Sequence, residues 1–94
     1  MDSEKLIERK LVEAVKARGG ICVKFYSAYQ RGVPDRIILM PGGRIYFVEL
    51  KSTGKKPTKL QQLFISKLEL LGFVVVVVDT IAGLNEFIKN KLWI

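Results

Sequence analysis

The residues of this 94-residue chain that could do chemistry are two carboxylates, Asp35 and Glu49, and the nearby Lys51. The carboxylates flank Pro41-Gly42-Gly43, whose composition favours a three-residue hairpin loop with a glycine in the left-handed position. With that loop, counting back along the hairpin places Asp35 directly opposite Glu49, with Cβ atoms about 5 Å apart. Lys51 would share this face, because alternate residues of a strand point to the same side. A two-residue Gly-Gly turn would instead pair Asp35 with Leu50, on the wrong face.

Two opposed carboxylates repel each other unless a cation lies between them. Hard divalent cations such as Mg²⁺ bind clustered carboxylate oxygens. Together with a lysine, such a cation can deprotonate a water molecule and stabilise growing negative charge without histidine. The sequence has no histidine, which excludes the Ser-His-Asp triad, HExxH sites and histidine-dependent metal nucleases. A single cysteine, Cys22, excludes a disulfide framework and a cysteine-rich zinc site.

Two further polar residues fall on the apolar faces of predicted helices. On a helical wheel of residues 3–18, Glu8 lies within the apolar arc, where an unpaired acid would lower the free energy of unfolding by several kcal/mol. On the helix predicted over 58–71, Gln61 lies within the apolar arc while Gln62 faces away. These side chains could converge with the carboxylates on one cleft. Alternatively, Glu8 pairs with a lysine at the edge of the core and Gln61 bonds to the backbone.

The elements that position these residues follow from hydrophobic periodicity and turn residues. The expected order is helix 3–18, strands 21–26, 35–40 and 44–51, helix 58–71, strand 73–78 and helix 82–91. The run of five valines within 73–78 predicts a strand buried on both faces, joined to 44–51 by a right-handed parallel crossover. We therefore expect one α/β domain over residues 1–94, a small mixed sheet flanked by helices.

The charge of the chain favours a polyanionic partner. Sixteen Lys and Arg residues against nine Asp and Glu residues give a net charge of +7, which suits nucleic acid. Residues 51–59 contain four lysines and no acid, and suit phosphate contacts, although a solvated charged loop would have the same composition. Tyr26 and Tyr29 could stack on DNA or simply pack the loop that contains them. The candidate DNA-binding cations are Arg31, Lys55, Lys56 and Lys59.

The apolar fraction of 49% is high for so small a domain and indicates apolar surface shared with a second copy. We expect the valine strand and Leu92-Trp93-Ile94 to form core or dimer surface. No apolar run reaches the length of a membrane span, and Met1–Lys5 does not resemble the start of a signal peptide. The expected location is therefore the cytoplasm, without membrane contact.

The candidate residues also resemble a known family. Gly32-Val33-Pro34-Asp35 followed by Glu49-Leu50-Lys51 looks like the motif of the PD-(D/E)xK nuclease superfamily. The wider series adds Glu8 in the first helix, Gln61 at the start of the second, and Gly72 before the valine strand. This series resembles the VRR-Nuc family over about residues 4 to 80, with Thr-Lys before Gln61 where the family often has Ser-Pro.

The resemblance implies a restriction-endonuclease-like core and a role for each residue. The implied ligands of Mg²⁺ or Mn²⁺ are Asp35, Glu49 and the backbone carbonyl of Leu50, with Glu8 completing the acidic shell or holding a metal-bound water. Lys51 would position or polarise the attacking water and offset charge on the phosphorane. Gln61 would orient the water or a phosphate.

Stand-alone members of the family are typical of phages and similar to dimeric Holliday-junction resolvases. The resemblance therefore implies a metal-dependent endonuclease, selective for branched DNA, that acts as a homodimer without a small-molecule cofactor. A phage or prophage in a bacterial host would encode it. One alternative is a non-catalytic nucleic-acid-binding module on the same fold, although such a module has no use for opposed carboxylates. A structural or assembly protein would explain the apolar surplus but not Glu8.

Overall fold

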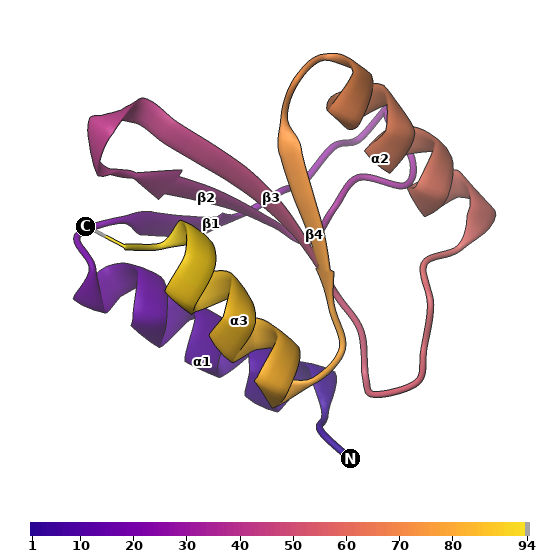
Figure 1. Ribbon diagram of the computed structural model, residues 1–94. Helices are drawn as coiled ribbons and strands as arrows, with labels where there is room; N and C mark the ends of the chain where they lie inside the picture. The colour runs from indigo at the N-terminus through magenta and orange to yellow at the C-terminus, as the bar shows by residue number, and fades with distance from the viewer. Residues whose placement is uncertain (94) are drawn as a thin grey trace.

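In the computed structural model, which describes residues 1–93, helices cover both faces of a four-stranded sheet (Figure 1). The elements are α1 (Glu4–Ala17), β1 (Ile21–Lys24), β2 (Arg36–Met40), a 3₁₀ turn (Pro41–Gly43), β3 (Arg44–Leu50), α2 (Lys59–Leu70), β4 (Val74–Val78) and α3 (Ile81–Lys91). Strand order is β1-β2-β3-β4, antiparallel except for the parallel pair β3–β4. The predicted fold class and element order are confirmed, with every boundary within two residues.

The core lies between the sheet and the pair α1 and α3, which pack side by side on one face (Figure 1). The apolar stripe of α1, which consists of Ile7, Leu11 and Val15, is completely buried. Alternate residues of β2 and β3 point into the same core because successive strand side chains face opposite ways. Those residues are Ile38, Met40, Tyr46, Val48 and Leu50.

On the other face, α2 covers only part of the sheet. The rings of Phe25, Phe47 and Phe64 pack there, with centroids 5.8 and 6.2 Å from Phe25. Toward the β2–β3 turn this face is open, and Ile21, Leu39 and Ile45 are exposed. These three residues are cross-strand partners, Ile21 opposite Leu39 and Leu39 opposite Ile45, and we call them the apolar row.

The valine strand is less buried than predicted. β4 is an edge strand, with β3 on one side only. Val78 is buried, but Val74 and Val77 are 37% and 41% exposed. The expectation of burial on both faces was wrong, because β-branched residues favour strands whether or not a helix covers them.

The end of the chain is fastened to β3 by Arg44. Its guanidinium donates to the carbonyls of Lys91 and Trp93, each at 2.7 Å, and lies 4.7 Å from the centre of the Trp93 ring. Leu92 belongs to the core, as expected, whereas the Trp93 side chain is exposed and Ile94 lies outside the described residues.

No helix within residues 1–93 has both the length and the apolar character needed to cross a bilayer.

Candidate functional site

The hairpin between β2 and β3 has the predicted register. Met40 pairs with Arg44, and the loop between them includes Gly43 at φ +74°. The ladder continues to the pair Arg36 and Val48, so the next positions in register are Asp35 and Glu49. The three-residue loop is thus confirmed, and both acids lie on the face of the sheet that carries α2.

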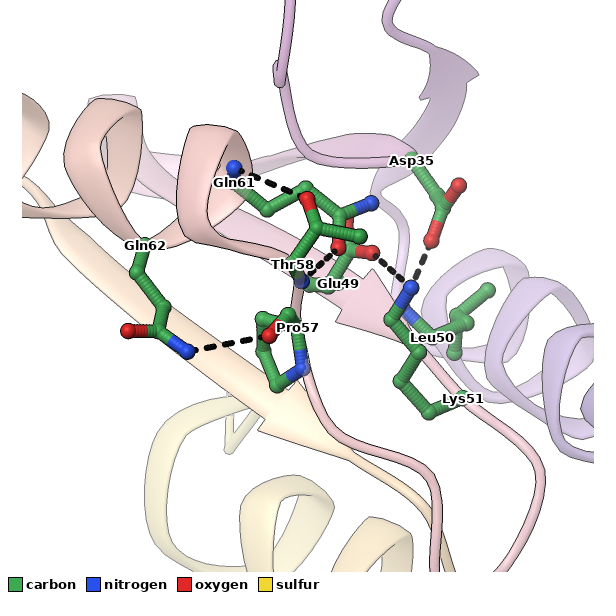
Figure 2. Close-up of polar contacts among 8 residues, drawn as sticks. All are labelled: Asp35, Glu49, Leu50, Lys51, Pro57, Thr58, Gln61 and Gln62. Carbon is green, nitrogen blue, oxygen red and sulfur yellow. Dashed lines mark hydrogen bonds and ion pairs between the residues drawn. The ribbon is translucent and has the colours of Figure 1, made fainter.

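Asp35, Glu49 and Lys51 meet where β3 ends (Figure 2). Asp35 Oδ2 accepts a hydrogen bond of 2.7 Å from the backbone N–H of Leu50. Lys51 Nζ lies 3.1 Å from Glu49 Oε2. The backbone N–H of Lys51 donates to the carbonyl of Val78 at 3.0 Å, which extends the β3–β4 pairing and fixes the start of the following loop.

Glu49 is a buried carboxylate with little compensation. Its side chain is 1% exposed, and Oε2 forms an ion pair with Lys51, but neither carboxylate oxygen accepts a hydrogen bond of good geometry from a described residue. Burial, and secondly the charge of Asp35, raise the pKa of Glu49 from 4.5 to about 7, although Lys51 acts in the opposite direction. A carboxylate in this state is ready to accept a ligand of positive charge.

The donor set fits a hard divalent cation. It contains two carboxylates and the backbone carbonyl of Leu50, which points toward Asp35 because the N–H and C=O of a strand residue share a direction. The unbonded oxygens of Glu49 are the groups that such a cation would satisfy. Within residues 1–93, no cluster of three or more Asp, Glu, Cys or His side chains suited to a metal is found. The side chains of this donor set are thus the pair Asp35 and Glu49.

Glu8 is held by Arg36 instead of joining the two acids. Glu8 Oε2 lies 2.9 Å from Arg36 Nε, and the same guanidinium donates to the carbonyl of Cys22 at 3.3 Å. Arg36 follows Asp35 directly, but its side chain points to the α1 face, as those of Ile38 and Met40 do. Glu8 thus forms an ion pair, as the alternative interpretation expected, but its partner is Arg36 and not a lysine, and its role at the acidic site stays a prediction.

Gln61 stabilises the first turn of α2. Its side-chain Oε1 accepts a hydrogen bond of 2.8 Å from the backbone N–H of Thr58. The backbone N–H of Gln61 donates to Thr58 Oγ1 at 3.2 Å, which completes a capping box (Figure 2). The predicted contrast with Gln62 is confirmed, since Gln61 is half-buried and Gln62 is exposed. Backbone bonding therefore occupies the oxygen of the Gln61 side-chain amide, while its Nε2 has no hydrogen-bond partner among the described residues.

Gly32 connects the two halves of the site, a role that the sequence analysis missed. It has φ +81°, and a Cβ there would lie 2.5 Å from the backbone oxygen of Leu60 and 3.0 Å from the N of Gln61. The loop that contains Gly32 is closed by a hydrogen bond of 2.9 Å from Phe25 N to Asp35 O. Gly32 thus lets this loop rest directly on the first turn of α2, and only its place in the motif gave any signal of it.

Thr53 is a second residue that sequence reasoning missed. Its hydroxyl accepts from Asp2 N and donates to Asp79 O, both at 2.8 Å. These bonds join the N-terminus, the end of β4 and the basic loop after Lys51.

The predicted DNA-binding cations are exposed, and none forms an ion pair within residues 1–93; they are Arg31, Lys55, Lys56 and Lys59.

Comparisons with known proteins agree with this geometry. No family model matches the chain. Over 77 residues it is 47% identical to "Putative nuclease p44" of Acyrthosiphon pisum secondary endosymbiont phage 1, covering 82% of this chain and 83% of that protein. Among solved structures it is similar to a chain described as a VRR_NUC domain, with a TM-score of 0.88 and 25% identity, covering 96% of this chain and 99% of that one.

The raised pKa of Glu49 predicts a pH-dependent stability in the absence of metal. Between pH 4.5 and about 7 the folded protein keeps a proton that the unfolded chain has lost, so the free energy of unfolding falls as the pH rises. The full loss, about 3 kcal/mol, would be present above pH 7. Glu49→Gln should flatten this slope and be at least as stable at pH 8, as measured by thermal and urea unfolding in EDTA. The exposed Glu13→Gln is the matched control, and equal slopes for wild type and Glu49→Gln would contradict the assignment.

Gly32→Ala should destabilise the fold more than Gly54→Ala does. Both glycines have positive φ, at +81° and +87°, so both changes carry a backbone strain of about 1–2 kcal/mol. A Cβ at Gly54 has nothing within 4 Å, whereas one at Gly32 collides with the backbone of Leu60. We expect Gly32→Ala to cost at least about 1 kcal/mol more in chemical unfolding. Equal costs would mean that the loop does not rest on α2.

Proposed function

Because this chain belongs to the VRR-Nuc family of nucleases, we propose that it is a Mg²⁺- or Mn²⁺-dependent endodeoxyribonuclease that cuts branched DNA, such as Holliday junctions, as a homodimer. The observation that carries the proposal is the buried carboxylate of Glu49, which lies beside Asp35, pairs only with Lys51 and accepts no hydrogen bond from a described residue. A sheet that buries such a group without a cation gives up stability for it, which is expected at a site of chemistry.

Each protein group has a distinct part in the proposed hydrolysis. Bound Mg²⁺ or Mn²⁺ would lower the pKa of a water molecule and neutralise phosphate charge. Asp35, Glu49 and the Leu50 carbonyl would hold it. Lys51, with Nζ 3.1 Å from Glu49, brings positive charge to the point where negative charge grows in the transition state. The free Nε2 of Gln61 can donate to the water or to a phosphate oxygen.

Glu8 acts as a positioning residue in this proposal. Its ion pair with Arg36 joins α1 to the residue that follows Asp35. The pair therefore helps to fix the entry of β2, and with it the direction of the Asp35 side chain.

DNA as the substrate is supported by charge. The chain carries +7, and its exposed lysines include Lys55, Lys56 and Lys59 on the segment that leaves the site. Anchoring by Thr53 holds the base of this segment beside Lys51. Such cations favour the phosphate backbone, which is common to all DNA structures. The relative p44 is a phage protein, and we place the action of this chain inside a bacterial host, on phage or host DNA.

The homodimer is supported by the apolar row and by symmetry. Ile21, Leu39 and Ile45 form an exposed apolar surface at the end of the sheet away from the carboxylates. A four-way junction has two equivalent scissile strands, and one site cannot reach both at once. A second copy on a two-fold axis would bury apolar surface and present two sites with matching symmetry.

A non-catalytic DNA-binding module on this fold is the second candidate. Its basic surface would be the same. It would not need the buried charge of Glu49, which a neutral residue could replace with a gain in stability. The buried carboxylate therefore favours the nuclease.

Asp35→Asn and Glu49→Gln should each lower Mg²⁺-dependent cleavage more than about 100-fold, because each removes a metal ligand. DNA affinity in EDTA should stay the same or increase, since a charge that repels phosphate is lost. The assay uses labelled four-way junction, fork and duplex DNA with Mg²⁺ or Mn²⁺, and parallel binding curves. Substantial nicking by either variant would contradict the metal assignment.

Two further variants separate the roles within the site. Lys51→Ala should reduce the cleavage rate more than metal affinity measured by calorimetry. Glu8→Gln should lower the melting temperature and leave Mg²⁺ affinity within about twofold, with Glu13→Gln as the matched control on the exposed side of α1. Loss of Mg²⁺ affinity at a retained melting temperature would instead make Glu8 a ligand.

The protein should be a dimer at micromolar concentration, by light scattering and sedimentation. Leu39→Glu, in the apolar row, should give a monomer and abolish paired nicking of the junction, because the charge would be buried on association. Lys16→Glu on the opposite face is the control for a surface acid and should remain dimeric. A wild-type monomer, both free and on junction DNA, would refute the homodimer.

A further inference from the structure

The loop of residues 25–34 that leads into Asp35 carries two tyrosines exposed to solvent. Tyr26 is 89% exposed and Tyr29 is 99% exposed. By contrast, the neighbouring Phe25 packs against Phe47 and Phe64. The alternative that these tyrosines pack the loop is therefore wrong, and the loop gains nothing from their apolar area.

The loop is held in a defined shape without help from the tyrosine rings. Its ends are joined by the hydrogen bond from Phe25 N to Asp35 O, and Gly32 rests on the backbone of α2. At the tip, Ser27 Oγ accepts from Gln30 N at 3.0 Å. Rings presented on a braced loop lose little conformational entropy when a ligand binds.

The backbone of the loop lies close to the proposed site. Tyr26 follows Phe25, whose N–H bonds to Asp35, so its backbone lies about 7 Å or less from that of Asp35. Figure 1 shows the connection between β1 and β2 running beside α2, whose first turn contains Gln61. The segment from Lys24 to Pro34 contains Lys24 and Arg31 and no acid. A segment that combines aromatic rings with cations has a composition typical of segments that bind nucleic acid.

We propose that Tyr26 and Tyr29 form a stacking surface for unpaired nucleobases at the branch point of the DNA. This inference rests on the proposed function and names the feature of the substrate that the site selects. In a continuous duplex the faces of the bases are covered by their neighbours, so a tyrosine ring finds no partner. At a fork, flap or opened junction an unstacked base presents its face, and each stacked base strengthens binding about 5- to 100-fold.

The test is a fork whose unpaired branch-point base is 2-aminopurine, compared with a duplex that contains the same base internally, in EDTA so that no strand is cut. Wild-type protein should quench the fluorescence of the fork and not of the duplex. The double variant Tyr26→Leu/Tyr29→Leu should lose this quenching and bind the fork about 5- to 100-fold more weakly, while duplex affinity changes less than about twofold. Tyr26→Phe/Tyr29→Phe keeps both rings and should behave as wild type. Equal melting temperatures of all three proteins exclude a folding effect.

Three outcomes decide between explanations. An unchanged preference for the fork in the leucine variant would overturn the inference and leave the tyrosines for another partner, such as a protein. An equal loss on fork and duplex would also overturn it, since the rings would then contact the backbone. If wild-type protein quenches the fork but cuts no DNA with Mg²⁺ or Mn²⁺, the proposed nuclease activity fails while the stacking surface stands.

Discussion

The surrounding elements of this structure must hold one carboxylate, that of Glu49, buried in the sheet. Glu49 is almost fully buried, faces Asp35 across a hairpin and has only the ammonium of Lys51 as a partner. Desolvation and like charge both oppose its ionised form. The surroundings hold it there by the hairpin register, by pairing with β4 and by the loop seated on α2. Burial of Glu49 thus lowers the free energy of unfolding, and the apolar core on the opposite face of the sheet offsets this loss.

Local patterns were sufficient to predict the elements and the hairpin register. The period of the apolar residues located the helices, and the Pro-Gly-Gly loop placed Asp35 opposite Glu49 before any tertiary contact was known. Contacts between distant segments could not be predicted in this way. Gly32 against Leu60, and Thr53 between Asp2 and Asp79, leave no periodic trace, because any turn can contain a glycine or a threonine. The prediction that β4 is buried on both faces was wrong for the same reason, since a run of valines does not indicate which elements cover the strand.

For the polar residues on the helices, the direction of the side chain could be predicted but its partner could not. Glu8 and Gln61 face inward as the wheels predicted, and each has a partner within the protein, Arg36 for one and Thr58 for the other. A helical wheel reports direction but not the identity of the group that a side chain meets. Arg36 lies on the α1 face only because Asp35 occupies the other, so the ion pair and the acidic site follow from one alternation of the strand.

The parallel pairing of β3 with β4 has a consequence for the order of folding. The hairpin that aligns the two acids needs only contacts between nearby residues, which form quickly. Burial of Glu49 waits for residues 59–78 to return and lay β4 beside β3, a slower, long-range closure. A chain that emerges from the ribosome N-terminus first therefore carries its acidic pair in water until its last quarter is made. Any ligand that binds only the completed site would stabilise this final step.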